Sequence, residues 1–463
     1  MKNNSKILRF LLCVSLLCIT LFSILSLSSC TDSLQYVAET KEEYVQNIDE
    51  LKSEDTYKFD YVSQYLRAIG TPVFDINKVL YFEEVFRQYY NLASGLPDKV
   101  THAVMSAEYF AENYYDTVDK SDKVAVTDAV IDSYVNVIGD IYSVYRPKEE
   151  SDAHIDNMSG KFGGIGVTIE FNYVLETAKI VEVGIDTPAE RAGVAVGDYI
   201  YAVDDKTLDE IGFENVADYT RGDVGEEVKL TVLRGDELIS FTITREIIDV
   251  KTVVYAIDDA GIGYIRISAF KENTFEQFVE AVDYIKSEGA VGVIFDVRNN
   301  PGGYVSSVVN MLSYILPSDR EIVSYDYKNG KHVSLKSADD EHPKTGEVYD
   351  HTLDIPMAVV CNEYTASSAE IFTAAIRDYR DMSLIEAVIV GETTYKKGII
   401  QITFPYSKDG SSVTLTVAYY APPSGECYHG IGITPDYMVE NTETEDVQLG
   451  EAYRLLLDLV NIN

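Results

Sequence analysis

Three polar side chains, Ser367, Lys397 and Gln401, stand in the motifs TASSAE and GETTYKKGIIQ. A serine hydroxyl is a poor nucleophile until a positioned base takes its proton. A lysine amine serves as that base when an enclosed, apolar site disfavours its charged form. Gln401 follows Lys397 by four residues, and its amide can orient the amine. These residue types are suited to acyl transfer, with Ser367 as a candidate nucleophile and Lys397 as one candidate general base.

Ser367 also has a structural interpretation. Ser367 and Glu370 stand three residues apart at the start of an expected helix, which is the spacing of a capping box. Ser368 is a rival nucleophile because it is the next hydroxyl in the motif. His429, in SGECYHGIG, is a second candidate base. Capping and catalysis are compatible at Ser367.

The same chemistry needs hydrogen-bond donors for a developing oxyanion. The turn NNPGG supplies the backbone amides of Gly302 and Gly303. The amide of Ser368 is expected at a helix N-terminus, where the helix dipole favours negative charge. These three amides are the predicted oxyanion hole.

The elements that position these groups alternate between strands and helices after residue 260. GIGYIRISAF and the apolar run VGVIF at 291–295 predict strands, and the apolar spacing at 275–285 and 305–315 predicts helices. Such units build a parallel or mixed sheet with sites at the carboxyl ends of its strands. We therefore predict a mixed α/β core over residues 248–463, ending in a helix.

Residues 160–247 carry short strands punctuated by glycine, in the order KFGGIGVTIE, DTPAERAGVAVGDYIYAVDD and GEEVKLTVLRGDELISFTITRE, which resembles a PDZ domain. A substrate tail would add to its edge strand by β-augmentation. The tail carboxylate would meet a nest of four backbone amides, from Gly164, Ile165, Gly166 and Val167. Arg221, in YTRGD, is a further candidate for binding that carboxylate.

The N-terminus has three basic residues, the apolar run FLLCVSLLCITLFSILSL and the sequence LSSC at 27–30, which resembles a bacterial lipobox. Residues 1–30 are predicted to be a lipoprotein signal peptide, with Cys30 carrying lipid. An uncleaved signal anchor is the alternative. Both place the protein outside the cytoplasm, anchored to the cell membrane. Residues 31–75 are predicted as an acidic stalk and residues 76–159 as a helical domain.

The composition excludes some functions. A formal charge of -38 disfavours a nucleic-acid partner, which needs clustered Lys and Arg. No HExxH or zinc-ligand pattern occurs, so no metal or other cofactor is expected. Cys361 and Cys427 are the cysteines left for the folded body, and one disulfide between them stays open.

The motifs RNNPGG, TASSAE, GETTYKKGIIQ and YYAPPSGECYHGIGITPD, in this order behind the PDZ-like segment, resemble the carboxyl-terminal processing peptidases, or tail-specific proteases. The resemblance spans residues 125–440. It implies a peptidase core of the crotonase or tail-protease type, and a Ser/Lys dyad that cleaves proteins near C-termini with apolar or small-residue tails. It also implies a possible homo-oligomer. Here Lys396 replaces the usual glycine, and Ser368 and Ala369 are reversed.

A second class of function remains open. A chain with this fold and an inactive dyad would be a PDZ-containing peptide-binding or chaperone-like protein. It would bind tails without cleaving them.

Overall fold

The computed structural model describes residues 38–53, 66, 70–92, 95–337, 340–341, 348–349, 353–442 and 444–462. The chain divides into two compact units, Met1–Glu84 with Leu96–Ile141, and Val85–Gly95 with Tyr142–Asn463. The predicted signal segment and Cys30 lie outside the described residues. Within the described ranges, no helix has the length and apolar content that crossing a membrane requires.

The first unit is helical, with α2 (Lys41–Ser53), α5 (Lys99–Asn113), α6 (Lys123–Asn136) and the first turns of α4 (Ile76–Tyr89). Tyr44 of α2 is buried, its ring packs on Tyr115, and its hydroxyl lies 3.0 Å from the Thr71 hydroxyl. Residues 41–53, predicted as part of a stalk, are therefore a packed helix. The unit ends at Ile141, before the predicted boundary at 159, because β1 (Val144–Arg146) pairs with a strand of the second unit.

The PDZ region begins and ends in a two-stranded ribbon of β2 (Lys161–Gly164) and β9 (Glu246–Asp249), which follows α7 (Lys148–Ser159). Its sheet is antiparallel in the order β3-β4-β5-β7-β8, and β6 pairs β5. Alternate residues of the strands point into one apolar core, which includes Ile180, Val203 and Leu230. The elements are β3 (Val167–Asn172), β4 (Thr177–Val183), α8 (Pro188–Ala192), β5 (Tyr199–Val203), β6 (Lys206–Thr207), α9 (Leu208–Ile211), η2 (Phe213–Asn215), α10 (Val216–Thr220), β7 (Glu227–Arg234) and β8 (Glu237–Thr244).

The core sheet has the order β10-β11-β12-β17-β18-β21, and only the β10–β11 pair is antiparallel. Its strands are β10 (Val253–Ile257), β11 (Ile262–Ile267), β12 (Gly292–Asp296), β17 (Met357–Cys361), β18 (Ala387–Gly391) and β21 (Tyr437–Met438). Strands β12, β17 and β18 are buried along their whole length, as expected for a parallel sheet covered on both faces. The prediction of a mixed α/β fold is confirmed.

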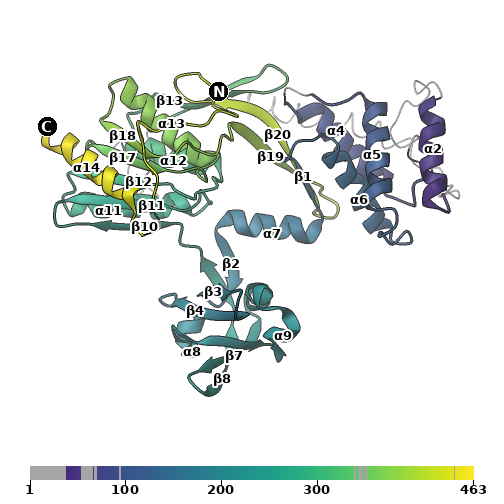
Figure 1. Cartoon of the computed structure of the whole chain (residues 1–463), viewed down its shortest axis with the longest axis horizontal. Coiled ribbons are helices and arrows are strands. Elements are labelled where there is room, and N and C mark those ends of the chain that lie inside the picture. The colour runs from purple at the N-terminus through teal and green to yellow at the C-terminus, as the bar shows by residue number, and fades with distance from the viewer. Residues whose placement is uncertain are drawn as a thin grey trace, which may run out of the picture. The chain divides into compact units, whose positions relative to one another are not determined.

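Helices cover both faces of this sheet (Figure 1). One face packs on α14 (Val447–Ile462) through Leu455 and Leu456. The other face packs on α11 (Thr274–Ser287), α12 (Val305–Ile315) and α13 (Ser368–Asp381), where the rings of Phe278, Phe295 and Phe372 meet. Helices therefore cover each face of the sheet, and the loops at the strand ends remain to form the site.

A second sheet in the order β1-β20-β13-β14, with β19 paired to β20, lies beside the core. Its strands are β13 (Glu321–Asp326), β14 (His332–Lys336), β19 (Ile399–Pro405) and β20 (Ser412–Ala421), and a short pair, β15 (Asp340–Glu341) and β16 (Val348–Tyr349), stands apart. The β19–β20 register shifts between Ile400 and Gln401. Such a bulge re-aims the side chains next to it.

A buried ion pair ties the core sheet to the start of α14. Asp296 is fully buried and accepts from Arg298 Nη2 at 2.6 Å and from the Tyr264 hydroxyl at 2.8 Å. Arg298 Nη1 also donates to Asp446 at 2.6 Å. Removing Arg298 would leave the Asp296 carboxylate in the core without its cation.

We expect Arg298→Met to lower the free energy of unfolding by about 3 kcal/mol, because a buried charge loses its partner. Urea denaturation followed by circular dichroism measures this. The control is Arg454→Met, which removes exposed ion pairs to Glu451 and Asp458 and is expected to leave the urea midpoint nearly unchanged. Equal losses in the two variants would contradict the importance of the buried pair.

Candidate active site

Ser367 lies at the carboxyl end of β17, in the loop that leads into α13. It is the N-cap residue of α13 and has φ +55° and ψ −119°. A positive φ is energetically unfavourable for a residue other than glycine, so contacts with neighbouring segments must stabilise this conformation. The loop that follows the neighbouring strand β12 provides these contacts. Asn300 O accepts from Ala366 N at 2.9 Å, and Val297 O accepts from Thr365 Oγ1 at 2.9 Å.

The Glu370 carboxylate joins the two segments that carry the predicted dyad. Its Oε2 accepts from the amides of Ser367 at 2.9 Å and Lys397 at 2.8 Å. Its Oε1 accepts from the Lys396 amide at 2.8 Å and the Thr394 hydroxyl at 2.6 Å. Burial raises the pKa of Glu370, and the four hydrogen bonds oppose this rise. Glu370 therefore makes the bond to the Ser367 amide that the predicted capping box requires. The same carboxylate also binds the segment that carries Lys397.

Lys397 contacts Gln401 as the sequence predicts. Lys397 Nζ donates to Gln401 Oε1 at 2.6 Å, and Gln401 Nε2 donates to the carbonyl of Tyr142. The amine also lies 4.8 Å from the centroid of the Tyr142 ring. Lys397 precedes β19 rather than lying in it, and the bulge of β19 falls at Gln401. Lys396, at the position where the resembled family has glycine, has φ +83°.

Tyr420 of β20 makes a second bridge between the two segments. Its hydroxyl donates to the Lys397 carbonyl at 2.6 Å. Burial raises the pKa of the Tyr420 phenol well above its usual value, and a hydrogen bond with the Ser367 side chain is among the influences that oppose the rise. Glu370 and Tyr420 thus each contact both Ser367 and Lys397.

The turn at residues 300–303 lies against Ser367. A Cβ on Gly302 would sit 2.7 Å from Ser367 Cβ and 2.9 Å from Ser368 N, and a Cβ on Gly303 would overlap the Phe270 carbonyl. Both glycines also have positive φ, so only glycine fits here. The absence of side chains at these two glycines therefore lets the turn pack directly against the Ser367 loop.

One of the three predicted oxyanion amides is already engaged. Gly302 N donates to Asn300 Oδ1 at 2.8 Å, because the Asn300 side chain folds back over the turn. In the described part of the chain, the amides of Gly303 and Ser368 have no acceptor. The Gly302 amide thus has an acceptor within its own turn, and the two predicted amides without an acceptor are those of Gly303 and Ser368.

The two rival side chains are otherwise engaged. Ser368 is fully buried, and its hydroxyl donates to the Gly303 carbonyl at 2.8 Å. His429 accepts from Gly398 N through Nδ1 at 3.3 Å, and its ring packs edge-on against Tyr419. The hydroxyl hydrogen of Ser368 and the Nδ1 atom of His429 are therefore engaged in structural hydrogen bonds.

The predicted tail-binding residues also come together. In the described residues the amides of Ile165 and Gly166 have no acceptor, while Gly164 and Val167 belong to β2 and β3. The Arg221 guanidinium lies 4.6 Å from the ring centroid of Phe162, beside this turn. Strand β3 is at the sheet edge, as β-augmentation requires.

Cysteine and metal chemistry stand apart from this site. Cys361 is buried and Cys427 is exposed, and both are free thiols, so the disulfide left open by the sequence does not form. Burial, followed by the Glu370 charge, raises the pKa of the Cys361 thiol. The ranges that the structure describes hold no group of three His, Cys, Asp or Glu side chains suited to a metal ion.

Several residues that build the site were missed from the sequence. They support the two loops through hydrogen bonds: Tyr142, Asn300, Thr365, Thr394 and Tyr420. Tyr420 stands in YYAPPSG, one of the quoted motifs, and Asn300 in NNPGG. Thr365 and Thr394 stand in TASSAE and GETTYKKGIIQ. A position in a motif was therefore the available signal for four of the five residues, while Tyr142 lies outside the motifs quoted above.

We expect Glu370→Gln to lower the free energy of unfolding by about 3 kcal/mol, because an amide NH2 would face backbone donors that now bond a carboxylate. Chemical denaturation measures the loss. Glu363→Gln is the matched control, since Glu363 is exposed in the same loop and is expected to change stability by about 0.5 kcal/mol or less. A Glu370→Gln protein as stable as this control would contradict the joining role of the carboxylate.

Comparisons with known proteins agree with the geometry. The model of peptidase family S41 matches residues 261–439, and a PDZ domain model matches residues 179–234. The chain is 33% identical over 336 residues to the carboxy-terminal processing protease CtpA of Bacillus subtilis, covering 72% of this chain and 67% of that protein. It is 34% identical over 326 residues to the carboxy-terminal-processing protease of Bartonella bacilliformis, covering 68% and 70%.

Among solved structures, the photosystem II D1 C-terminal processing protease aligns with 82% of this chain and 97% of its own, at 23% identity and a TM-score of 0.44. The relatives share enough identity over enough of both chains to define a family. The chain therefore belongs to the carboxy-terminal processing proteases of peptidase family S41, which are serine-type peptidases.

Proposed function

We propose that this protein is an endopeptidase that cleaves proteins near their C-termini with a Ser367–Lys397 dyad. The observation that carries the proposal is the Glu370 carboxylate, whose single oxygen Oε2 accepts from the amides of both residues. A catalytic pair must be held at close range, and a shared buried acceptor does this for the two main chains. The Lys397–Gln401 hydrogen bond supports the orienting role of Gln401.

In this proposal the uncharged Lys397 amine takes the proton from Ser367 Oγ as the oxygen attacks the scissile carbonyl. The oxyanion accepts hydrogen bonds from the amides of Gly303 and Ser368. Collapse of the tetrahedral intermediate breaks the C–N bond, and the lysine ammonium protonates the leaving amine. Water then attacks the acyl-enzyme with the same amine as base, which releases the new carboxyl end.

The PDZ domain is proposed to hold the substrate tail. Free amides at Ile165 and Gly166 suit a terminal carboxylate, and Arg221 beside them adds a positive charge. The edge of β3 would pair with the tail backbone. Apolar or small tail residues fit this mode because the neighbouring PDZ core is apolar.

We expect Ser367→Ala and Lys397→Ala each to lower the rate of cleavage of an unfolded protein with an apolar C-terminal tail by about 10⁴-fold. Both remove a group that acts in every turnover. The detergent-purified full chain is the enzyme, and mass spectrometry of the fragments gives the rate. Ser368→Ala and His429→Ala are the matched controls, expected to stay within about tenfold of the unmodified protein.

Each other outcome selects another function. Tail binding without any cleavage, unchanged by Ser367→Ala, indicates the peptide-binding or chaperone-like alternative. Loss of activity in His429→Ala with activity kept in Lys397→Ala indicates a Ser/His hydrolase. Equal fragment yields from all the variants would exclude the dyad.

The protein is further proposed to act outside the cytoplasm, tethered to the membrane by lipid on Cys30. The lipobox-like LSSC supports this. We expect Cys30→Ser to abolish incorporation of a labelled fatty acid, because the thiol is the acceptor, while Cys18→Ser keeps it. A mature N-terminus at Met1 in the unmodified protein would instead indicate a signal anchor.

A further inference from the structure

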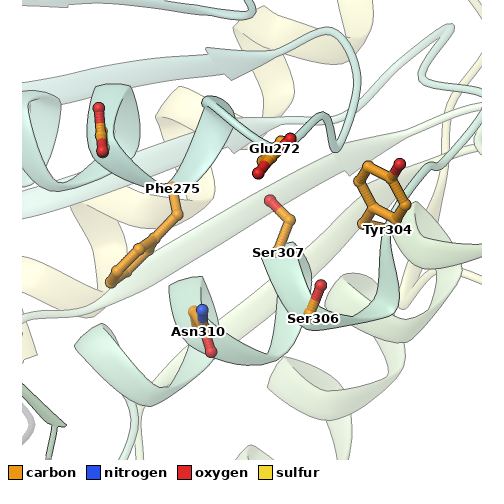
Figure 2. Close-up of a pocket in the computed structure, with 7 residues that line it drawn as sticks. Glu272, Phe275, Tyr304, Ser306, Ser307 and Asn310 are labelled. Atoms are coloured by element: carbon orange, nitrogen blue, oxygen red, sulfur yellow. The ribbon is translucent and has the colours of Figure 1, made fainter. Parts of the chain in front are cut away.

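A cavity of about 420 Å³ opens between the N-terminal ends of α11 and α12 (Figure 2). No role in the dyad, the oxyanion hole or the PDZ nest involves its lining. Its walls are the residues Glu272, Phe275, Glu276, Tyr304, Ser306, Ser307 and Asn310. The lining combines the rings of Phe275 and Tyr304 with polar side chains, and it carries two carboxylates and no basic side chain.

The two carboxylates have no cation of their own. Neither Glu272 nor Glu276 forms an ion pair within the described residues, and the amine of the adjacent residue Lys271 donates to Asn157 Oδ1 at 2.6 Å. Glu276 lies in the first turn of α11, where a negative charge is favourable. Glu272 precedes the helix, so the dipole of α11 accounts for one of the two charges at most.

Ser307 gives an independent sign that the cavity takes a polar group. Its side chain is 5% exposed, and the hydroxyl points into the cavity (Figure 2). The one hydrogen bond it makes in the described chain is to Met311 Sδ at 3.9 Å, and a thioether is a weak acceptor. The lone pairs of this buried oxygen therefore have no donor, which a bound N–H group would supply.

The cavity is connected to the Ser367 loop through the turn at residues 302–304. Tyr304 lines it, the preceding residue Gly303 carries a free oxyanion amide, and Gly302 packs on Ser367. Consecutive Cα atoms are about 3.8 Å apart. The Cα atom of Tyr304 is therefore at most two such lengths from the Cα atom of Gly302, the residue that packs on Ser367. An extended substrate advances about 3.3 Å per residue. A side chain that enters the cavity therefore belongs to a residue within about three positions of the scissile bond.

We propose that this cavity is a substrate subsite for the cationic side chain of a lysine or arginine close to the scissile bond. The methylenes pack on Phe275, while the charged head meets Glu272 and Glu276 and donates to Ser307. This inference rests on the proposed peptidase function. It adds a charge requirement near the cut to the recognition of the tail.

The test uses peptides that share one cleaved sequence with an apolar tail, and that carry lysine or the uncharged norleucine at each of three positions on either side of the cut. At one position, the full chain is expected to prefer lysine by about tenfold in kcat/KM. The double variant Glu272→Gln/Glu276→Gln is expected to lose this preference and to cleave the norleucine peptides at an unchanged rate. Raising the salt concentration should reduce the preference of the unmodified protein.

The control is Glu288→Gln, a charge removal at the other end of α11, about 18 Å along the helix from Glu276. It should keep the lysine preference. No preference at any position, or a preference that survives in the double variant, overturns the subsite.

Binding to the full-length Ser367→Ala protein separates this inference from the proposed function. If the unmodified protein cleaves nothing, the peptidase proposal fails, and the subsite then depends on the binding comparison alone. Tighter binding of a lysine peptide than of its norleucine partner, lost in the Glu272→Gln/Glu276→Gln background, supports the subsite. Equal binding of the two peptides refutes it.

Discussion

The structure of the site depends on one buried carboxylate. Glu370 is fully buried, and burying a carboxylate is costly unless donors surround it. Its four donors come from the start of α13 and from the 394–397 segment, so satisfying this one charge fixes two distant pieces of chain against each other. The separation between Ser367 and Lys397 main chains is thus set by electrostatics as much as by packing. Tyr420 reinforces it from the other side, through the Lys397 carbonyl.

The parallel sheet supplies the platform on which this happens. Strands β12 and β17 are neighbours and end at the same edge, so their loops meet there. The loops are joined by reciprocal hydrogen bonds between Asn299 and Asn362. Backbone strain gathers at the same place, with positive φ at Ser367 and Lys396. Such conformations persist only where the surroundings over-determine them, and here the buried network does so.

Substrate handling would divide between two sites of opposite character. Under the two proposals, the free amides of the PDZ turn and Arg221 would bind a terminal carboxylate, while the carboxylates and hydroxyls of the α11–α12 cavity would bind a cation. Each site presents charged side chains that form no ion pair within the described chain. A substrate that bound both sites would be recognised at its C-terminus and near its scissile bond. Two such contacts would discriminate between substrates better than either contact alone.

The sequence by itself determined the order of elements and the family. Apolar runs predicted β12 and the helices on either side of it, and two short contiguous motifs marked Ser367 and Lys397 as the candidate dyad. Long-range contacts were decided only in the tertiary structure. The Asn300 carbonyl accepts from the Ala366 amide, the Tyr142 ring meets the Lys397 amine, and the Tyr44 ring of α2 packs on Tyr115. Such pairings join segments tens to hundreds of residues apart, and no local pattern records which donor will reach which acceptor once the chain has folded.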